Sequence, residues 1–261
     1  MSESKLLALD KKLKENELIY GSLIFIGHPA LTECMAQIGF DVLWIDMEHT
    51  AIDNESLLMN LIGAKAGGTP AWVRIRWNDP VLAKPVLDMG ADGIIFPYIR
   101  TAEEARQAVS ACLYPPEGVR GYGPLRALRY GEISQMEFVT STYRNCKRII
   151  QIEHIDAVKN LSEIVKVKDI DAFIFGPNDL SGSLGLIGQV RHPDCLRVYE
   201  EAAKILRESG IPFGVATGFD SEWLNYWKNL GASIFFCGHD AAYVQSGATA
   251  LLSDFQTCLN D

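Results

Sequence analysis

Several features typical of other protein classes are absent from this sequence of 261 residues. No apolar run approaches the roughly 20 residues that a membrane-spanning helix needs. The N-terminal segment MSESKLLALDKKLKENE is polar and charged, unlike the basic-then-apolar order of a secretory signal peptide. No basic cluster is long enough to follow a phosphate backbone, and 24 Lys and Arg against 33 Asp and Glu give a net charge of −9. We therefore expect a cytoplasmic protein that binds neither membranes nor nucleic acid.

Motifs built on cysteine and glycine are also missing. The six cysteines are scattered, with no C-x-x-C pair and no histidine at zinc-finger spacing, so we interpret them as buried free thiols. This pattern supports neither a cysteine nucleophile nor a zinc site. No G-x-G-x-x-G turn follows the first predicted strand, which argues against a doubly wound, dinucleotide-binding sheet but leaves an open sheet as the alternative fold.

Short apolar segments bounded by turn residues predict eight strands, and helical patterns lie between them. Strands that alternate with helices form a parallel sheet, and strands as apolar as these should be buried on both faces. We therefore predict a (β/α)8 TIM barrel of the α/β class, formed by residues 1–261 as a single domain. The predicted strands are 20–25, 42–46, 71–75, 93–97, 148–152, 171–175, 212–216 and 233–237.

One connection, at about 114–147, is too long for an ordinary loop between a helix and a strand. It contains the sequence YPPEGVRGYGPLRALRYG. We predict a functional loop region with short helices.

Carboxylates follow two neighbouring predicted strands at the end where a parallel barrel places its active site. Glu153 follows the fifth strand and Asp179 the sixth. Because Mg²⁺ and Mn²⁺ prefer one or two carboxylates, with water and substrate completing the octahedron, this pair predicts a metal site. The alternative for each residue is a helix cap. If Asn178 and Asp179 begin a helix, their backbone N–H groups would form a corner that binds a carboxylate.

A histidine and an arginine follow two other strands. His49 lies beside two acids, which suits a general base or a proton relay through water, with a purely structural histidine as the alternative. Arg74 ends an apolar strand and needs an anion, either a substrate oxygen or Asp46 or Glu48 across the mouth of the barrel. A Schiff-base aldolase would need a lysine at a strand end, but the lysines lie in helical patterns and connections.

Six sequence segments follow one another over nearly the whole chain: IDMEHT (45–50), VRIRWNDP (73–80), LDMGADGIIFP (87–97), YPPEGVRGYG (114–123), QIE (151–153) and GPNDLSGSLG (176–185). Taken in this order, they resemble the class II, metal-dependent pyruvate aldolases of the 4-hydroxy-2-oxoheptanedioate aldolase family. This HpcH/HpaI aldolase family also includes the 2-keto-3-deoxysugar-acid aldolases. The resemblance implies a barrel of the phosphoenolpyruvate/pyruvate-binding type.

The resemblance also implies roles for individual residues. Glu153 and Asp179 would hold a divalent cation, Mg²⁺ or Mn²⁺ with Co²⁺ as a further candidate. Arg74 would contact the keto oxygen of pyruvate and stabilise its enolate, and His49 paired with Asp88 would hold a catalytic water. Other positions would bind substrate: Gln151, Gly176, Pro177, Asn178, Asp179 and Arg120. Arg120 would contact an acidic aldehyde or the acidic tail of the substrate, and it could do so across a subunit boundary.

Members of this family exchange their last helix between subunits, which makes residues 239–259 candidates for such an exchange. The implied assembly is a homohexamer built as a trimer of dimers. The implied reaction is a lyase reaction (EC 4.1.2.-), the reversible cleavage of a 4-hydroxy-2-oxo acid to pyruvate and an aldehyde. Alternatives are oxaloacetate decarboxylation or a thioester lyase reaction through the same enolate, and a barrel that binds metal and ligand without turnover.

This sequence departs from the family pattern at three positions and in one segment. Leu23 stands where many members have Trp, Asn178 replaces a small Ala, and Arg76 replaces a small or apolar residue. The segment GYGPLRALRYG is more basic and aromatic than the family pattern. These changes concern the aldehyde side of the site, so the sequence leaves the aldehyde unidentified.

Overall fold

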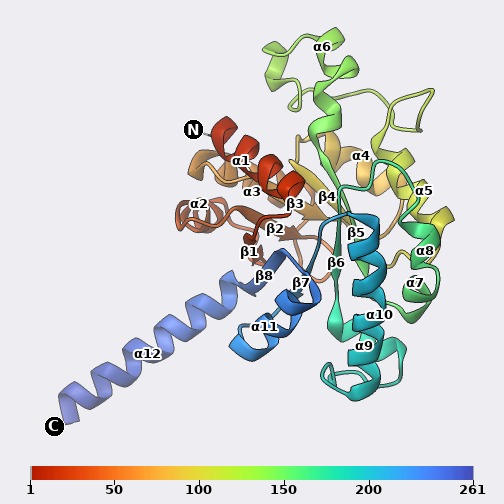
Figure 1. Ribbon diagram of the computed structural model, residues 1–261. Coiled ribbons are helices and arrows are strands. Elements are labelled where there is room, and N and C mark those ends of the chain that lie inside the picture. Colours follow the sequence, from red (N-terminus) through yellow and green to blue (C-terminus); the bar gives the residue numbers. More distant parts are fainter. Residues whose placement is uncertain (1, 261) are drawn as a thin grey trace.

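The predicted strands form a closed parallel barrel in the computed structural model, which describes the backbone of residues 2–260 and the side chains of residues 5–260 (Figure 1). The strands follow one another around the barrel in sequence order, and β8 pairs with β1 to close it. The predicted (β/α)8 barrel is confirmed, and every predicted strand end lies within two residues of the observed one. The strands are β1 Ile19–Ile24, β2 Val42–Asp46, β3 Ala71–Arg74, β4 Gly93–Phe96, β5 Lys147–Ile152, β6 Ala172–Phe175, β7 Phe213–Thr217 and β8 Ile234–His239.

Helices connect the strands around the outside of the barrel (Figure 1). Two of them begin where the local sequence favours a helix start. The side chain of Asp79 caps the helix that begins at Pro80, and Thr101 and Glu104 form a capping box. The α-helices are α1 Ser2–Glu15, α2 Pro29–Gln37, α3 Asn54–Gly67, α4 Pro80–Asp88, α5 Ala102–Cys112, α6 Gln135–Thr140, α7 Ile155–Lys159, α8 Leu161–Ile164, α9 Pro177–Ser183, α10 Pro193–Ser209, α11 Ser221–Leu230 and α12 Asp240–Asn260.

The barrel interior is filled by large aromatic side chains and closed at one end by α1. Trp44, Trp72 and Phe236 are fully buried there. Leu9 and Leu13 of α1 belong to the same buried cluster, so this helix covers the floor of the barrel, at the amino ends of the strands. Gly93 leaves the space that Trp72 needs, because a Cβ at residue 93 would lie 2.4 Å from Trp72 Cδ1.

The long connection between α5 and β5 contains short helices, as predicted. Besides α6 it has two 3-10 turns, η1 Arg129–Gly131 and η2 Thr142–Asn145. Three of its aromatic side chains pack on one another, with the ring centroids of Tyr114 and Tyr143 4.9 Å apart and Phe138 beside them, and they belong to the same buried cluster as the outer side chains of the barrel strands. We call residues 114–146 the insertion.

The last helix, α12, points away from the barrel (Figure 1). Of its residues only Asp240 is buried. Asp240 anchors the start of the helix by accepting hydrogen bonds from the backbone N–H groups of Phe25 and Ile26, at 2.9 and 3.0 Å. Beside it, strands β1 and β8 and helix α11 leave open an apolar groove of about 300 Å³, whose lining includes Leu18, Phe219, Leu224 and Phe235. None of the helices that the structure describes could span a lipid bilayer.

The cysteines are all free, as predicted, but they are not all buried. Cys112 and Cys195 are buried, whereas Cys34 and Cys258 are exposed. The prediction of burial is wrong for the exposed pair because Cys34 lies on the solvent side of α2 and Cys258 lies on the projecting α12.

Candidate active site

The centre of the site is an arginine held by a carboxylate from the neighbouring strand. Arg74 ends β3 and Asp46 ends β2, and the two residues are register partners. Arg74 donates through Nε to Asp46 Oδ1 at 2.9 Å and through Nη2 to Asp46 Oδ2 at 2.6 Å, a bidentate pair that fixes the guanidinium plane. Burial alone would lower the pKa of Arg74, but the hydrogen bonds and charge of Asp46 raise it, so the side chain stays cationic.

Glu48 and His49 extend this cluster toward solvent. Arg74 Nη1 lies 3.1 Å from Glu48 Oε2, and His49 Nε2 lies 3.6 Å from the same oxygen. Burial raises the pKa of Glu48 against the opposing charges of Arg74 and His49. The His49 side chain is 59% exposed, so water can reach it beside the site. Asp46 and Glu48, the two carboxylates that the sequence suggested as partners of Arg74, therefore both contact it.

Glu153 follows β5 and is almost completely buried, at 2% exposure. Its Oε1 accepts a hydrogen bond from the Tyr98 backbone N–H at 2.6 Å, and its Oε2 accepts one from Gln151 Nε2 at 2.6 Å. Gln151 Oε1 in turn accepts from Arg74 Nη1 at 3.4 Å. Burial raises the pKa of Glu153 to about 8, and the charge of Glu48 adds to this effect.

The chain between β6 and α9 passes very close to Glu153. A Cβ at Gly176 would lie 3.0 Å from Glu153 Oε2, which explains a glycine at this position. Pro177 begins α9, and Asn178 and Asp179 lie exposed in its first turn. Their backbone N–H groups are therefore among the unpaired donors at the start of a helix, as the predicted carboxylate corner requires.

Neither metal-ligand candidate serves as a helix cap. The cap of α9 is Gly176, and the cap of α7 is His154, whose Nδ1 accepts from Asp156 N. The alternative explanation for Glu153 and Asp179 is therefore wrong.

The donor set fits a hard divalent cation. Glu153 is a buried carboxylate, and no cationic side chain that the structure describes forms an ion pair with it. The charge of Asp179 lies close enough to raise the pKa of Glu153 further. A set of only two carboxylates leaves coordination positions for water and substrate, which is how proteins usually hold Mg²⁺. Residues 5–260 contain no group of three or more His, Cys, Asp or Glu side chains that could hold a metal ion, so these two carboxylates would be the ligands that this chain supplies.

Asp88 and Arg120 do not join this site within one chain. Asp88 ends α4, which carries the chain back from the carboxyl end of β3 to the amino end of β4. Its Oδ1 accepts from Arg120 Nη2 at 3.0 Å. Arg120 is buried and also packs against the Tyr114 ring. The predicted pair of His49 and Asp88 is thus split between opposite ends of the barrel.

Comparison with known proteins agrees with this geometry. The family model described as HpcH/HpaI aldolase/citrate lyase matches residues 23–225. The chain belongs to this family. Its members named here are aldolases, so the predicted lyase class is confirmed.

Two curated relatives and one solved structure illustrate the likeness of this HpcH/HpaI chain to its family. It is 35% identical over 241 residues to the 2-dehydro-3,6-dideoxy-6-sulfogluconate aldolase of Pseudomonas putida, covering 92% of this chain and 93% of the relative. It is 34% identical to the 4-hydroxy-2-oxo-heptane-1,7-dioate aldolase of Shigella sonnei over 85% of each chain. The crystal structure of an HpcH/HpaI family protein from Burkholderia cenocepacia superposes with a TM-score of 0.88 at 26% identity, over 95% of this chain and 99% of the other.

Tyr98 is a site residue that sequence reasoning missed. Its backbone has φ +59°, the left-handed region, and this conformation accompanies the hydrogen bond from its N–H to Glu153. Its ring stacks on Trp77 with centroids 5.5 Å apart. The position directly after Pro97 at a strand end was a usable signal, but the direction of a backbone N–H cannot be read from residue type.

Proposed function

We propose that this chain is a divalent-metal-dependent pyruvate aldolase that reversibly cleaves a 4-hydroxy-2-oxo acid to pyruvate and an aldehyde. The observation that carries the proposal is the pairing of a buried carboxylate that lacks a cation, Glu153, with a rigidly held arginine, Arg74. Such a pair can hold a metal chelate of a 2-oxo acid and stabilise negative charge on its keto oxygen. We propose Glu153 and Asp179 as ligands of Mg²⁺ or Mn²⁺, with Co²⁺ as a further candidate. The metal supplies Lewis-acid polarisation of the keto group when bound.

The protein side chains would divide the remaining work. In the cleavage direction the C3–C4 bond breaks, the C4 hydroxyl loses its proton to become the aldehyde, and C3 later gains a proton. Arg74 donates hydrogen bonds toward the oxygen that gains charge, while Asp46 fixes its orientation. The backbone N–H groups of Asn178 and Asp179 hold the substrate carboxylate. His49, exposed beside Glu48, moves the hydroxyl proton through a water molecule.

Exchange of the methyl protons of pyruvate for deuterium tests the enolate directly. In D₂O with Mg²⁺ or Mn²⁺, the protein should deuterate the methyl group, seen as loss of its proton NMR signal, and a chelator should stop the exchange. Borohydride added with pyruvate should leave every lysine unmodified, because no Schiff base forms. A metal-replete protein that leaves pyruvate protonated would contradict the proposal. The predicted alternatives, oxaloacetate decarboxylation and thioester cleavage, share the enolate, so product analysis separates them from aldol cleavage.

The names of the two relatives indicate a class of aldehyde. One name specifies a sulfo group at the far end of the substrate and the other a second carboxylate. We propose that this enzyme also takes an aldehyde with an acidic tail. Arg120 lies at the amino end of its own barrel, so it could contact that tail only in the active site of a neighbouring subunit. Asp88 could likewise pair only with the His49 of a neighbouring subunit. Arg76, which donates to the Ile52 carbonyl at 2.7 Å, is the second candidate.

We also propose that the chain, as a single-domain cytoplasmic enzyme, assembles into a homohexamer by exchanging α12. In an ordinary (β/α)8 barrel the last helix packs on the outside of the strands, but here it projects away and leaves the apolar groove beside β8 and β1 open. One side of α12 carries exposed apolar residues at helical spacing that would fit such a groove on a second copy: Val244, Leu252, Phe255 and Leu259.

Phe255→Asp should therefore break the assembly. The wild-type protein should have the mass of an oligomer in light scattering coupled to size exclusion, and the variant should shift to smaller species because a charge cannot enter an apolar groove without a large desolvation cost. Gln256→Asp adds the same charge one residue further along the helix and serves as the matched control. Equal masses for the Phe255 variant and the wild type would show that α12 is not the exchanged element.

A further inference from the structure

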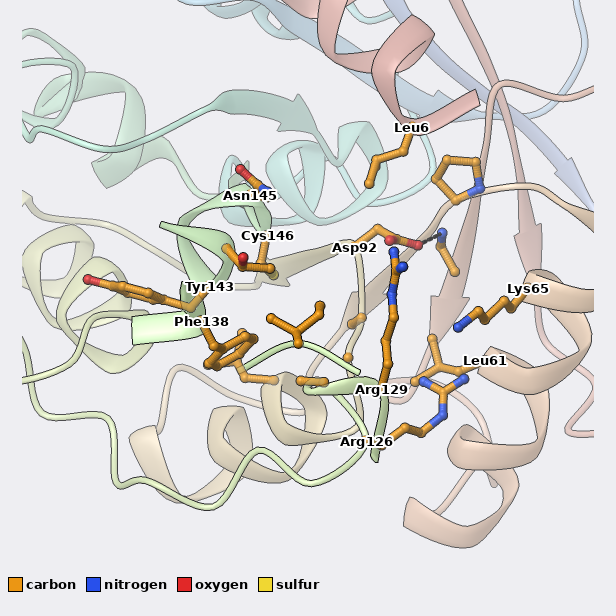
Figure 2. Close-up of a pocket in the computed structure, with 18 of the residues that line it drawn as sticks. Leu6, Leu61, Lys65, Asp92, Arg126, Arg129, Phe138, Tyr143, Asn145 and Cys146 are labelled. Atoms are coloured by element: carbon orange, nitrogen blue, oxygen red, sulfur yellow. Dashed lines mark hydrogen bonds between the residues drawn. The ribbon is translucent and has the colours of Figure 1, made fainter. Parts of the chain in front are cut away.

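A second cavity lies at the floor of the barrel, at the opposite end from Glu153 and Asp179. Its volume is about 580 Å³. One wall is formed by residues at the amino ends of three strands, including Ala71, Asp92 and Cys146. The facing wall belongs to the insertion, and Leu6 of α1 closes one side (Figure 2). A cavity of this size accommodates a small organic molecule.

Positive charge predominates in the cavity lining. Four cationic side chains, Lys65, Arg120, Arg126 and Arg129, face two carboxylates, Asp92 and Glu132, a difference of two positive charges. Glu132 lies 3.6 Å from Arg129. The carboxylate of Asp92 accepts the Ala71 backbone N–H at 2.9 Å, and burial raises its pKa to about 6, so it opposes an anion less than an ordinary aspartate in mildly acidic solution.

Two of these arginines are incompletely paired for their degree of burial. Arg126 is half-buried and donates to the Met89 carbonyl, but no ion pair joins it to a carboxylate within residues 5–260. Burial accordingly lowers the pKa of Arg126. Arg120 is 4% exposed, and although its Nη2 is paired with Asp88, its Nε is a buried donor without an acceptor. Buried polar groups are rarely left unpaired, so the Nε of Arg120 indicates a missing partner.

The rest of the lining is apolar. Leu61 of α3 and Ile133 and Phe138 of the insertion form a surface next to the arginines, and Figure 2 shows Leu61 and Phe138 facing the same space as Arg126 and Arg129. If only an inorganic ion bound here, this apolar surface would stay exposed to water. A molecule with an anionic head and an apolar body would cover it.

We propose that this cavity binds a small organic anion, with its phosphate or carboxylate head at Arg126 and Arg120 and its apolar body against Leu61, Ile133 and Phe138. Arg126 and Arg120 belong to the insertion, whereas Lys65 and Leu61 belong to the barrel. The bound anion therefore joins the insertion to the barrel floor. Arg120 also pairs with Asp88, so the ligand would contact one of the two residues that, in the subunit arrangement proposed above, reach a neighbouring active site, and it would lie next to the other.

Titration of the full-length protein with phenyl phosphate, in the presence of a chelator, tests this site. The chelator keeps the probe from binding through a metal at the other end of the barrel. Phenyl phosphate should bind more tightly than either inorganic phosphate, which lacks the body, or benzyl alcohol, which lacks the charge. Arg126→Met should weaken phenyl phosphate binding at least about tenfold, the loss expected for one charged hydrogen bond.

Two further variants complete the test. Arg106→Met removes an exposed arginine of α5 that lies outside the cavity, and it should bind the probe like the wild type. Lys65→Met removes charge from the barrel wall without altering the insertion, so it reports on the site if the Arg126 variant folds poorly. A several-fold weaker affinity is expected for it. Equal affinity of the wild type and both cavity variants, or absence of phenyl phosphate binding to the assembled protein, would overturn the proposal.

Discussion

Glu153→Gln should reduce metal-dependent deuteration of pyruvate at least about 10³-fold, because the amide cannot supply the charge that a divalent cation needs and several kcal/mol of charge stabilisation are lost. The fold should survive the change. Burial raises the pKa of Glu153 to about 8, so the metal-free wild-type side chain is mostly protonated at pH 7 and a neutral amide replaces a neutral acid. The Nε2 of the new Gln cannot accept a hydrogen bond from Tyr98 N or Gln151 Nε2 as the carboxyl oxygen does, so we expect a modest fall in the melting temperature without metal.

Mn²⁺ binding measured by electron paramagnetic resonance separates the metal role from a general loss of activity. The Gln variant should bind Mn²⁺ at least about 100-fold more weakly than the wild type. Glu163→Gln, on the surface of α8 where Glu163 pairs with Lys166, is the matched control and should bind normally. Unaltered Mn²⁺ affinity in the Glu153 variant would remove this residue from the ligand set.

Arg74→Met should impair both catalysis and folding. The Arg74 side chain is 8% exposed and Asp46 is fully buried, so the variant leaves a buried carboxylate without its cation. Breaking a buried ion pair in this way costs about 3–5 kcal/mol of unfolding free energy. Loss of the donor to the enolate oxygen should lower the rate of pyruvate deuteration about 10²–10³-fold. Urea denaturation and proton NMR measure the two effects.

A double variant distinguishes the two roles of Arg74. Arg74→Met combined with Asp46→Asn removes both charges, so part of the lost stability should return. Catalysis should not return, because the enolate donor is still absent. If activity recovered together with stability, Arg74 would be a structural residue only.

The fold followed from the sequence because its determinants are local. Continuous apolar runs such as IIFP and FIFG are typical of strands buried on both faces, and they recur at intervals that leave room for a helix. Glu153 and Arg74 were predictable for the same reason. A polar residue directly after a parallel strand must lie at the carboxyl end of the sheet, whatever the rest of the chain does.

The parts that could not be predicted depend on distant segments. The covering of the barrel floor by α1 requires a match between Leu9 and Leu13 and the interior side chains of several strands. The direction of the Tyr98 N–H depends on a backbone conformation that sequence does not specify. The floor cavity exists only because the insertion returns to the amino ends of β3, β4 and β5.

The sequence by itself thus determined the barrel, the family and the carboxylates at the strand ends, including Glu153, whose position follows from the end of an apolar strand segment. Tertiary structure decided which charges meet. It placed Asp46 and Glu48 on Arg74, and it carried Asp88 to Arg120 at the other end of the barrel. The physical reason is that the pattern of apolar residues along a short segment determines its local structure. The partner of a charged group depends instead on which distant helices and loops the closed barrel brings next to it.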